Sequence, residues 1–475
     1  MNILIGYSLL LLYFLLVFLL IGGLVKKAFG VVFSRKIIHI FTGLSWFIYD
    51  YFIGCSFHQI IICAVFLLIS ILSRRFNIIK TIENPETKSN GTIYFSIALL
   101  FLTTLSFFIP ELYPYVGFSI IALAIGDGSA TLIGKCLKSP KIYHDKTLLG
   151  FIACIVFSFV GFVLYNYLYS KLFDIIELVL LSVIAGIFEE EDLKGFDNIT
   201  VSLSTFAAMI LFDYCENILV PICIFCGLFL ICFFCKIMTY HGSLLSSFIG
   251  ASFFFIGGLK AAIFAASLYI VLIVIHVIKK IMKRRELEVV KKDKEKDLLQ
   301  VVANGIISLV FLYLFLIIER PILLVLSLLV FSNSFVDSIA SDIGSFSRMK
   351  PYDIFKKKMV EPGVSGGMTI LGTCSAVIAS IIFSFAIWFL FNGHYVLLIV
   401  FPLIMMTCCF MDSLLGSLVQ AKYMCETCGL ITEKEEHCGS QTKLVEGFRF
   451  FDNDMVNLLC SILCGLLCIP IALIL

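Results

Sequence analysis

Residues 126–135 read GDGSATLIGK and place one aspartate inside a long apolar run. Residues 336–344 read VDSIASDIG, and in both stretches an aspartate (Asp127, Asp337) precedes a glycine by seven positions. A carboxylate inside a membrane costs several kcal/mol unless it is paired, hydrated or bound to metal, so each stretch marks a candidate functional site. The repetition predicts two active centres, or one centre built from two halves.

The composition is that of a membrane protein. Hydrophobic residues make up 60% of the 475 residues, charged residues 14%, and the mean hydropathy is +1.06. A soluble domain of this length does not need so much apolar surface, so we expect an all-α polytopic membrane protein. The net charge of +2 gives no reason to expect a nucleic-acid partner. The 18 cysteines are scattered through apolar runs, which favours buried thiols over a disulfide framework.

Apolar stretches alternate with short polar breaks along the whole chain. We count about sixteen stretches that are candidate membrane spans. The first is too long for the core of a signal peptide, so we expect it to be retained. The predicted spans lie near residues 3–24, 37–53, 59–73, 92–109, 116–134, 148–169, 174–188, 199–214, 218–238, 244–258, 261–278, 300–318, 321–340, 368–391, 395–411 and 455–475.

Basic residues are concentrated in alternate breaks between the predicted spans. When the spans are threaded alternately across the membrane, these basic breaks fall on one side, and the opposite breaks are almost free of Lys and Arg. The positive-inside rule makes the basic side cytosolic and the N-terminus non-cytosolic. For a eukaryotic protein we expect the endoplasmic reticulum, with a plastid-type membrane as the less favoured alternative.

The longest charged stretch, residues 279–297, is the natural boundary between two halves. We expect a solvated helical linker there, with binding to anionic lipid as the alternative. The prediction is a first membrane module at residues 1–215, connecting spans and linker at 216–298, and a second module at 299–475. Spans from about residue 236 are assigned to the second module, and the two modules are expected to be related.

Residues 126–150 carry the groups that a phosphate-binding site requires. Such a site needs Mg²⁺ held by carboxylates, cations for the remaining phosphate charge, and glycines that let backbone N–H groups approach. Asp127 is the predicted metal ligand and a predicted catalytic residue. Packing of helices against a small-xxx-small face is the alternative role for the glycines. The residues expected to bind nucleotide are Gly126, Gly128, Lys135, Lys146, Thr147 and Gly150, of which Lys146 is also expected to act in catalysis.

Two flanking segments add candidate groups. Arg35 and His39 lie one helical turn apart at the mouth of a predicted span, and we expect both to act in catalysis. Anchoring at the membrane surface explains Arg35 equally well. Glu189 and Asp197 lie in the strongly acidic break of the basic side, and we expect them to supply further Mg²⁺ ligands.

The order of these motifs resembles that of the phytol kinase and dolichol kinase family. The resemblance covers about residues 1–215 and implies transfer of phosphate from CTP, or another nucleoside triphosphate, to the hydroxyl of a long-chain lipid alcohol. Phytol, geranylgeraniol, farnesol and dolichol are the acceptors that it suggests. The chain departs from the family at Cys136-Leu137-Lys138, which leaves the geometry of the donor phosphates open. The matching motifs are Arg35-Lys36-x-x-His39, Gly91-Thr92-Ile93-Tyr94, Ala124 to Ala130, Lys146-Thr147-x-x-Gly150, Glu189, and Asp197 to Val201.

The second half contains the motifs Asp337-Ser338-x-Ala340-Ser341-Asp342-x-Gly344, Pro362-Gly363-x-x-Gly366-Gly367 and Asp412-Ser413-x-x-Gly416. Through these motifs, residues from about 236 to 475 resemble a second membrane family, which contains plant phytyl-phosphate kinase. The resemblance implies that this half converts a lipid monophosphate into the diphosphate. Asp342 stands where relatives usually carry Glu. The residues carried over are Asp337, Asp412 and Asp454 as Mg²⁺ ligands, Asp337 and Asp342 as catalytic residues, and Gly363, Gly366 and Gly367 as nucleotide-binding residues.

Four soft metal ligands lie close together near the C-terminus. Cys425, Cys428, His437 and Cys438 occur within fourteen residues and have the ligand types of a zinc knuckle. A bound Zn²⁺ ion and ordinary reduced thiols both fit this pattern. We expect a structural role in either case.

Two other functions remain open from the sequence. A lipid cytidylyltransferase would also bind CTP and Mg²⁺ beside a lipid headgroup. A secondary transporter would also combine many spans, internal repeats and acidic groups, but its site is expected near the middle of the membrane, whereas these motifs lie at the ends of spans. A lipid kinase therefore fits the pattern best.

Overall fold

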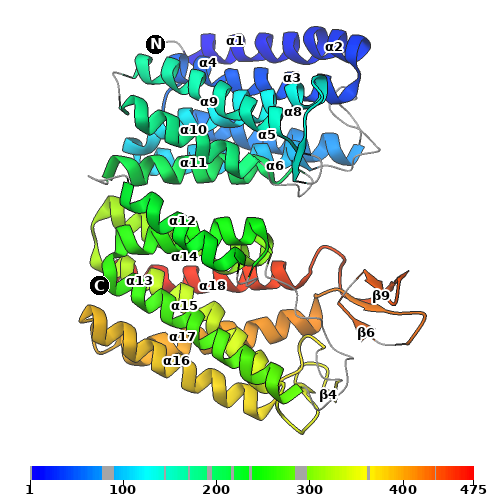
Figure 1. Ribbon diagram of the computed structural model, residues 1–475, viewed down its shortest axis with the longest axis vertical. Coiled ribbons are helices and arrows are strands. Elements are labelled where there is room, and N and C mark those ends of the chain that lie inside the picture. The colour runs from blue at the N-terminus through cyan, green and yellow to red at the C-terminus, as the bar shows by residue number, and fades with distance from the viewer. Residues whose placement is uncertain are drawn as a thin grey trace. The chain divides into compact units, whose positions relative to one another are not determined.

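The computed structural model describes residues 3–76, 90–143, 146–169, 172–189, 195–214, 219–234, 238–283, 297–360, 364–429, 431–433 and 435–474. The chain forms two compact units, Met1–Glu216 (unit 1) and Asn217–Leu475 (unit 2). Both are bundles of helices with short strands in their loops (Figure 1). Most of the predicted linker, residues 284–296, lies outside the described residues.

The all-α polytopic architecture is confirmed, with fewer spans than expected. In the described part of the chain, 12 helices are long and apolar enough to cross a membrane. The sequence predicts about sixteen. Two of the predicted spans, 244–258 and 261–278, both fall in α13 (Tyr240–Lys283), in which two helices meet at a sharp kink where Gly258 has non-helical backbone angles (φ 74°, ψ 179°). Three further predicted spans lie on helices too short or too polar to be among the 12, namely 174–188, 199–214 and 218–238.

Unit 1 is built around a buried span that carries Asp127. Helices α7, η3 and α8 form most of this span, and 78% of the residues in an apolar stretch of 18 within it are buried. Its middle part, η3, is a π-helical turn that ends at Asp127, and such turns inside helices are frequent at functional sites. The helices are α1 (Ile3–Leu15), η1 (Leu16–Ile21), α2 (Gly22–Phe29), α3 (Val31–Leu44), α4 (Trp46–Phe52), α5 (Phe57–Phe76), α6 (Gly91–Phe108), η2 (Pro110–Leu112), α7 (Tyr113–Ile121), η3 (Ala122–Asp127), α8 (Gly128–Cys136), α9 (Leu148–Leu168), α10 (Ile175–Glu189) and α11 (Asp197–Tyr214).

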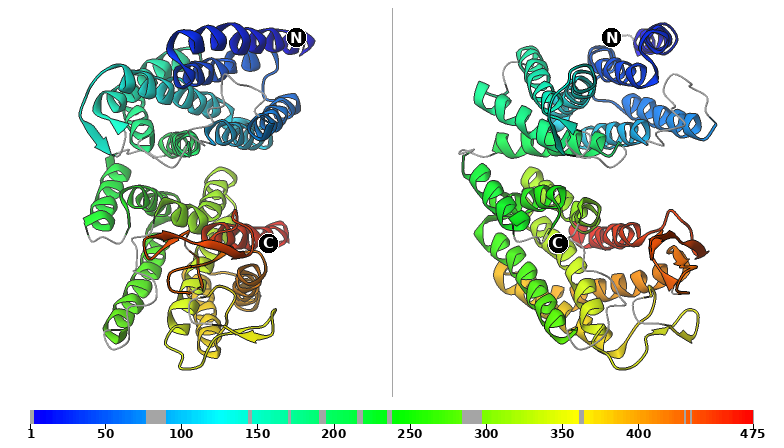
Figure 2. Two further views of the ribbon diagram at one scale, coloured as in Figure 1. Left: turned by 90° about the vertical axis from the view of Figure 1, so that its right-hand side faces the viewer. Right: turned by 45° about the vertical axis from the view of Figure 1, so that its right-hand side comes forward.

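Unit 2 is built around the span that carries Asp337. In this helix, α15, 78% of the residues in an apolar stretch of 18 are buried, the same share as in the Asp127 span of unit 1. The right-hand view of Figure 2 shows the strands of the α17–α18 loop, coloured orange to red, projecting beyond the helices of unit 2. The helices are α12 (Leu219–Phe234), α13, α14 (Leu298–Ile318), α15 (Pro321–Gly344), α16 (Ile370–Phe391), α17 (Leu397–Leu418) and α18 (Asn453–Ile474).

All strands of the described residues belong to small antiparallel hairpins or to one three-stranded sheet in the loops. Because they connect helix ends, they shape the loops of each unit and add nothing to its spans. They are β1 (Lys141–Tyr143), β2 (Lys146–Thr147), β3 (Tyr352–Asp353), β4 (Lys358–Met359), β5 (Lys422–Met424), β6 (Ile431–Thr432), β7 (Glu436–His437), β8 (Ser440–Gln441) and β9 (Lys443–Glu446).

The central helix of unit 1 meets the next helix through a close contact of glycines. A Cβ on Gly150 of α9 would lie 3.0 Å from the Ala130 carbonyl, and one on Gly134 would lie 2.7 Å from Thr147 Oγ1. Thr147 caps α9, since its Oγ1 accepts a hydrogen bond from the Gly150 amide at 3.2 Å. The glycines therefore let α8 and the start of α9 approach each other closely.

Unit 2 repeats this contact. A Cβ on Gly372 of α16 would lie 2.8 Å from the Ala340 carbonyl, and one on Gly344 would lie 3.0 Å from Thr369 Oγ1. Thr369 caps α16 by accepting from the Gly372 amide at 3.1 Å. In each unit an aspartate, Asp127 or Asp337, lies two helical turns before the glycine that makes this contact.

Gly43 sets the distance between α3 and the central span of unit 1. A Cβ at Gly43 would lie 2.1 Å from the Ala124 Cβ and 3.4 Å from its Cα, so neither helix can relieve the overlap by rotating a side chain. α3 also carries Lys36 and His39, and η3 ends at Asp127. Close packing at Gly43 therefore brings these side chains within reach of one another.

We predict that Gly43→Ala destabilises unit 1, because overpacking at a rigid helix contact costs about 1–3 kcal/mol. Thermal unfolding of the purified protein in detergent measures the effect, and the unfolding temperature should fall. Gly23→Ala is the matched control, since nothing lies within 4 Å of a Cβ at Gly23 of α2. Equal unfolding temperatures for the two variants would show that Gly43 does not hold α3 against η3.

Candidate phosphate- and metal-binding site

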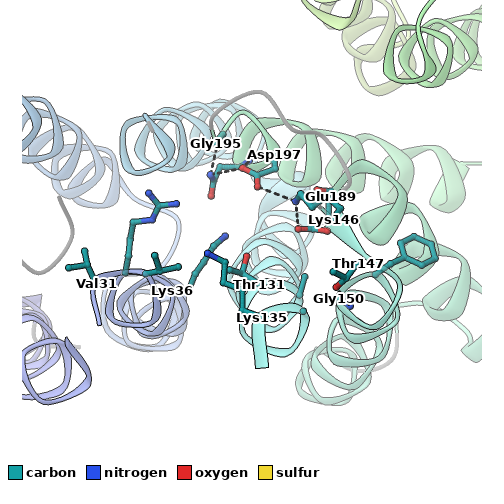
Figure 3. A pocket seen from close by; sticks show the side chains of 16 residues that line it. Val31, Lys36, Thr131, Lys135, Lys146, Thr147, Gly150, Glu189, Gly195 and Asp197 are labelled. Carbon is teal, nitrogen blue, oxygen red and sulfur yellow. Dashed lines mark hydrogen bonds and ion pairs between the residues drawn. The ribbon is translucent and has the colours of Figure 1, made fainter. Parts of the chain in front are cut away.

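One end of the unit 1 bundle contains a cavity of about 230 Å³. Strand β2 and the ends of α3, α8, α9, α10 and α11 line it. The polar groups of these helices meet there because the five helix ends lie at the same end of the bundle (Figure 3). The cavity is lined by Val31, Val32, Arg35, Lys36, Ala130, Thr131, Gly134, Lys135, Lys146, Thr147, Gly150, Phe151, Glu189, Gly195, Asp197 and Asn198.

Asp127 is fully buried and is held by two side chains of α3. The Lys36 ammonium donates to Asp127 Oδ1 at 2.6 Å and to Oδ2 at 2.8 Å. His39 Nε2 lies 3.3 Å from Asp127 Oδ2 and 3.0 Å from the Leu123 carbonyl. Since an uncompensated buried charge costs several kcal/mol, Lys36 is what allows Asp127 to remain ionised here.

A second ion pair lies in the lining of the cavity. The Lys146 ammonium donates to a Glu189 carboxylate oxygen and, at 2.6 Å, to the Glu189 carbonyl, and it lies 3.7 Å from Asp197 Oδ2. Burial alone would lower the pKa of Lys146, but the carboxylates of Glu189, Asp197 and Asp127 together raise it above its usual range. Lys146 therefore stays charged at physiological pH. Figure 3 shows it joined to Glu189 and Asp197.

The three carboxylates converge on one point. One ligand oxygen from each of Asp127, Glu189 and Asp197 lies within 4.8 Å of the others, and the three residues are 0%, 1% and 9% exposed. Oxygens that share a Mg²⁺ ion lie about 2.1 Å from it, hence at most about 4.2 Å apart, so small side-chain movements would suffice for coordination. The residues present therefore fit a divalent cation.

The glycines predicted to bind nucleotide divide into two groups. A Cβ at Gly126 would lie 2.2 Å from Ser158 Oγ, and one at Gly128 would lie 2.3 Å from Ile40 Cγ1, so both pack against neighbouring helices. Neither lines the cavity, which agrees with the helix-packing alternative. Gly150 lines the cavity together with Thr147 and Lys135.

Two residues of the site were not assigned a role from the sequence. Lys36 was noted only as part of a motif, although its spacing of three residues from His39 places both on one helix face. Asn198 lies in the first turn of α11, where its backbone and side-chain N–H groups donate to Asp197 Oδ1 at 2.9 and 3.0 Å. Its own side-chain oxygen is buried and has no partner among the described residues.

The predicted Mg²⁺ ligands of unit 2 do not form a comparable group. Among the described residues, Asp337, Asp412 and Asp454 are absent from the sets of side chains whose ligand atoms lie within 4.8 Å of one another. The Cys409 thiol donates to Asp337 at 3.8 Å and the Cys460 thiol donates to Asp412 at 3.9 Å. These partners are neutral thiols, whereas unit 1 uses ammonium groups.

The other predicted residues of unit 2 lie in its loops and helix ends. Gly366 has a φ of +87°, and a Cβ there would lie 2.6 Å from the Ser417 backbone, so only glycine fits against the end of α17. Gly367 packs against Val360, 2.6 Å from where its Cβ would be. Asp342 lies in the last turn of α15. Gly363 lies outside the described residues.

Comparison with known proteins gives one match. No curated protein and no solved structure matches the chain significantly. Residues 223–465 match the family described as integral membrane protein DUF92. The match covers more than half of the 475 residues, and the helices are those of a membrane protein. The chain therefore belongs to the DUF92 family of integral membrane proteins.

Proposed function

We propose that unit 1 is a lipid kinase that transfers the γ-phosphate of CTP, or of another nucleoside triphosphate, to the hydroxyl of an isoprenoid alcohol. The observation that carries the proposal is the cavity lined by Glu189, Asp197 and cationic side chains, with the buried Asp127 carboxylate within 4.8 Å of the other two. A phosphoryl-transfer site needs this combination, because the protein contributes mainly positioning and charge stabilisation. The motif order of residues 1–215 is the second support.

Mg²⁺ is the expected cofactor, and Asp127, Glu189 and Asp197 are the residues that would hold it. When bound, it would neutralise phosphate charge during transfer. The ammonium groups of Lys36 and Lys146 would then have a second role. Both ammonium groups line the cavity and can turn from their carboxylates to phosphate oxygens.

The remaining cationic side chains extend this phosphate-binding surface. Arg35 and Lys135 also line the cavity, and a guanidinium can bind phosphate through two parallel hydrogen bonds. In the reaction, the acceptor oxygen attacks the γ-phosphorus, the bond to the β-phosphate oxygen breaks, and CDP leaves. The proton of the acceptor hydroxyl passes to one of the three carboxylates. Among the described residues nothing bonds to the Asn198 side-chain oxygen, which can therefore accept a hydrogen bond from that hydroxyl.

The place of the cavity suits a lipid acceptor. It lies at the ends of spans, where a headgroup hydroxyl can reach it while the chain stays in the bilayer. Unit 1 exposes large apolar side chains, such as Val156 and Val160 of α9, to the surrounding hydrocarbon. Phytol, geranylgeraniol, farnesol and dolichol all present such a hydroxyl.

We predict that Asp127→Asn abolishes phosphorylation of a lipid alcohol by γ-labelled CTP, with a loss of at least about tenfold, since removing a charge-stabilising group costs several kcal/mol. Activity is measured per mole of monodisperse protein, so that unfolding is not mistaken for lost chemistry. Asp213→Asn is the matched control. Asp213 lies near the other end of α11, bonded to the Tyr115 hydroxyl at 2.7 Å, and its variant should remain active.

The reaction products separate the competing functions. A kinase transfers the γ-label to lipid and releases CDP, whereas a cytidylyltransferase releases the label as pyrophosphate and transfers CMP. Label in pyrophosphate alone would establish the cytidylyltransferase and overturn the kinase. Movement of lipid or phosphate compound across vesicles without turnover of CTP would establish a transporter.

We further propose that unit 2 extends the lipid monophosphate to the diphosphate. The support is the repeated contact of Gly344, Thr369 and Gly372, which places Asp337 on unit 2 as Asp127 is placed on unit 1. A monophosphate acceptor carries about two more negative charges than an alcohol, so a separate site is expected for it. Lysines of the α15–α16 loop, including Lys356 and Lys358, can offset that charge.

Asp337→Asn should make lipid monophosphate accumulate, because only the second step loses its carboxylate. Asp127→Asn should block formation of monophosphate from the alcohol but still extend monophosphate that is supplied. Thin-layer or mass-spectrometric analysis of the lipid products distinguishes the two. Loss of the same single step in both variants would mean that the two units form one active site.

We also propose that the loops carrying Lys141 and Lys356 face the cytosol, in the endoplasmic reticulum of a eukaryotic cell, because the basic loops follow the positive-inside pattern. Single cysteines at these positions, in a background without other reactive thiols, should react with a membrane-impermeant maleimide added to the cytosolic side. A cysteine at His394, in the α16–α17 loop, should react only from the other side. Labelling of Lys141 and His394 positions from the same side would contradict this orientation.

A further inference from the structure

We infer that the loop between α17 and α18 binds one structural zinc ion through Cys425, Cys428, His437 and Cys438. This site is separate from the proposed kinase site and does not depend on it. The ligand atoms of the four side chains all lie within 4.8 Å of one another. Three thiolates and an imidazole are a ligand set of structural zinc sites, which are closed by four protein ligands.

The observed distances are close to the edges of a zinc tetrahedron. His437 Nδ1 lies 3.4 Å from Cys428 Sγ and 3.2 Å from Cys438 Sγ. Bond lengths of about 2.3 Å to sulfur and 2.0 Å to nitrogen predict an S···N edge of about 3.5 Å. A zinc ion can therefore enter with shifts of a few tenths of an ångström in these side chains.

The backbone presents the ligands on two facing turns. Cys425 and Cys428 lie in the turn between β5 and β6, where the Gly429 amide donates to the Cys425 carbonyl at 2.8 Å. His437 is the last residue of β7, and Cys438 follows it in the turn between β7 and β8. Thr427 Oγ1 and Ser440 Oγ are hydrogen-bonded at 3.0 Å across the two turns.

In each turn a ligand residue, or the residue directly after it, has a left-handed backbone conformation. Gly429 has a φ of +71° and Gly439 one of +74°, both directly after a cysteine ligand. Cys438 itself has a φ of +53°, which is uncommon for a residue with a Cβ and has an energetic cost. Coordination of Cys438 would compensate that cost.

The loop has little apolar core that could stabilise it without a metal. All four residues of β9 are exposed, and large apolar side chains of the loop such as Ile431 and Leu444 are 53% and 40% exposed. A segment of this size without a core usually needs a metal or a disulfide, and the cysteines here are free. Zinc binding would supply the missing stabilisation.

Zinc would also order the neighbouring part of unit 2. The loop joins α17, which carries Asp412, to α18, which carries Asp454. Lys422 of β5 donates to the Ser365 carbonyl at 2.8 Å, and the Ser365 hydroxyl donates to Glu433. These hydrogen bonds connect the zinc-binding loop to the turn at Gly366, which lies between α15 and α16 and packs against the end of α17.

The test is the metal content of the purified full-length protein, carrying no polyhistidine tag. Mass spectrometry of the metal should find about one zinc ion per chain. The zinc content of Cys428→Ser should be at least about tenfold lower than that of the wild-type protein. Cys136→Ser and Cys374→Ser are matched controls, since both cysteines are exposed and neither belongs to the group, and they should keep the full zinc content.

Two measurements on the wild-type protein make the test independent of how the variants fold. A mercurial that blocks thiolates should release the zinc, and cobalt(II) exchanged into the site should give thiolate-to-metal charge-transfer absorption. Wild-type protein without zinc that also fails to take up zinc or cobalt would overturn the inference. Full zinc content in Cys428→Ser would overturn this assignment of ligands.

Discussion

A carboxylate can lie inside a helix bundle only while a nearby cation, metal or substrate compensates its charge, and the end of unit 1 is organised around that constraint. Lys36 and His39 meet Asp127, and Lys146 meets Glu189 and Asp197. Each of these contacts joins two different elements, so the ion pairs fix the helix ends as well as the charges. Lys36 and Lys146 also line the cavity, so stability and ligand binding depend on the same two side chains.

The two units share one contact between helices, but the side chains around it differ. In both, a buried central helix carries an aspartate and then a glycine that allows the next helix, capped by threonine, to approach. Around Asp127 the neighbouring groups are cationic, whereas Cys409 and Cys460 are the donors to Asp337 and Asp412. The shared contact fixes the backbone, and the residues on neighbouring helices determine the chemistry.

Much of the fold follows from hydropathy, and the errors have local causes. The sequence predicts an all-α membrane protein because the apolar stretches are long and numerous. The break that the sequence predicts at Gly258 is present, since this residue has a non-helical φ of +74° and two helices meet there within α13. α10 shows the limit of hydropathy, since its 15 residues are apolar but too few to count as a span. Helix length depends on where the backbone hydrogen bonds end, which hydropathy does not report.

Most residues of the candidate site could also be named from the sequence, because charged groups are rare in apolar surroundings. Asp127, Lys146, Glu189 and Asp197 were found in this way, and they meet in unit 1. Gly126 and Gly128 were expected to face phosphates but pack against Ser158 and Ile40. Which side of a helix a glycine faces depends on the partner helix, so one-dimensional spacing does not determine it.

The sequence by itself determined the membrane class, the chemical types at the site and the soft-ligand group near the C-terminus. Only the tertiary structure decided that Lys36, 91 positions before Asp127, is its partner, and that Asp337, Asp412 and Asp454 do not converge as the unit 1 carboxylates do. The physical reason is that composition and spacing describe only the order of residues along the chain. Charge compensation acts through space, between side chains that only the packing of the helices brings together.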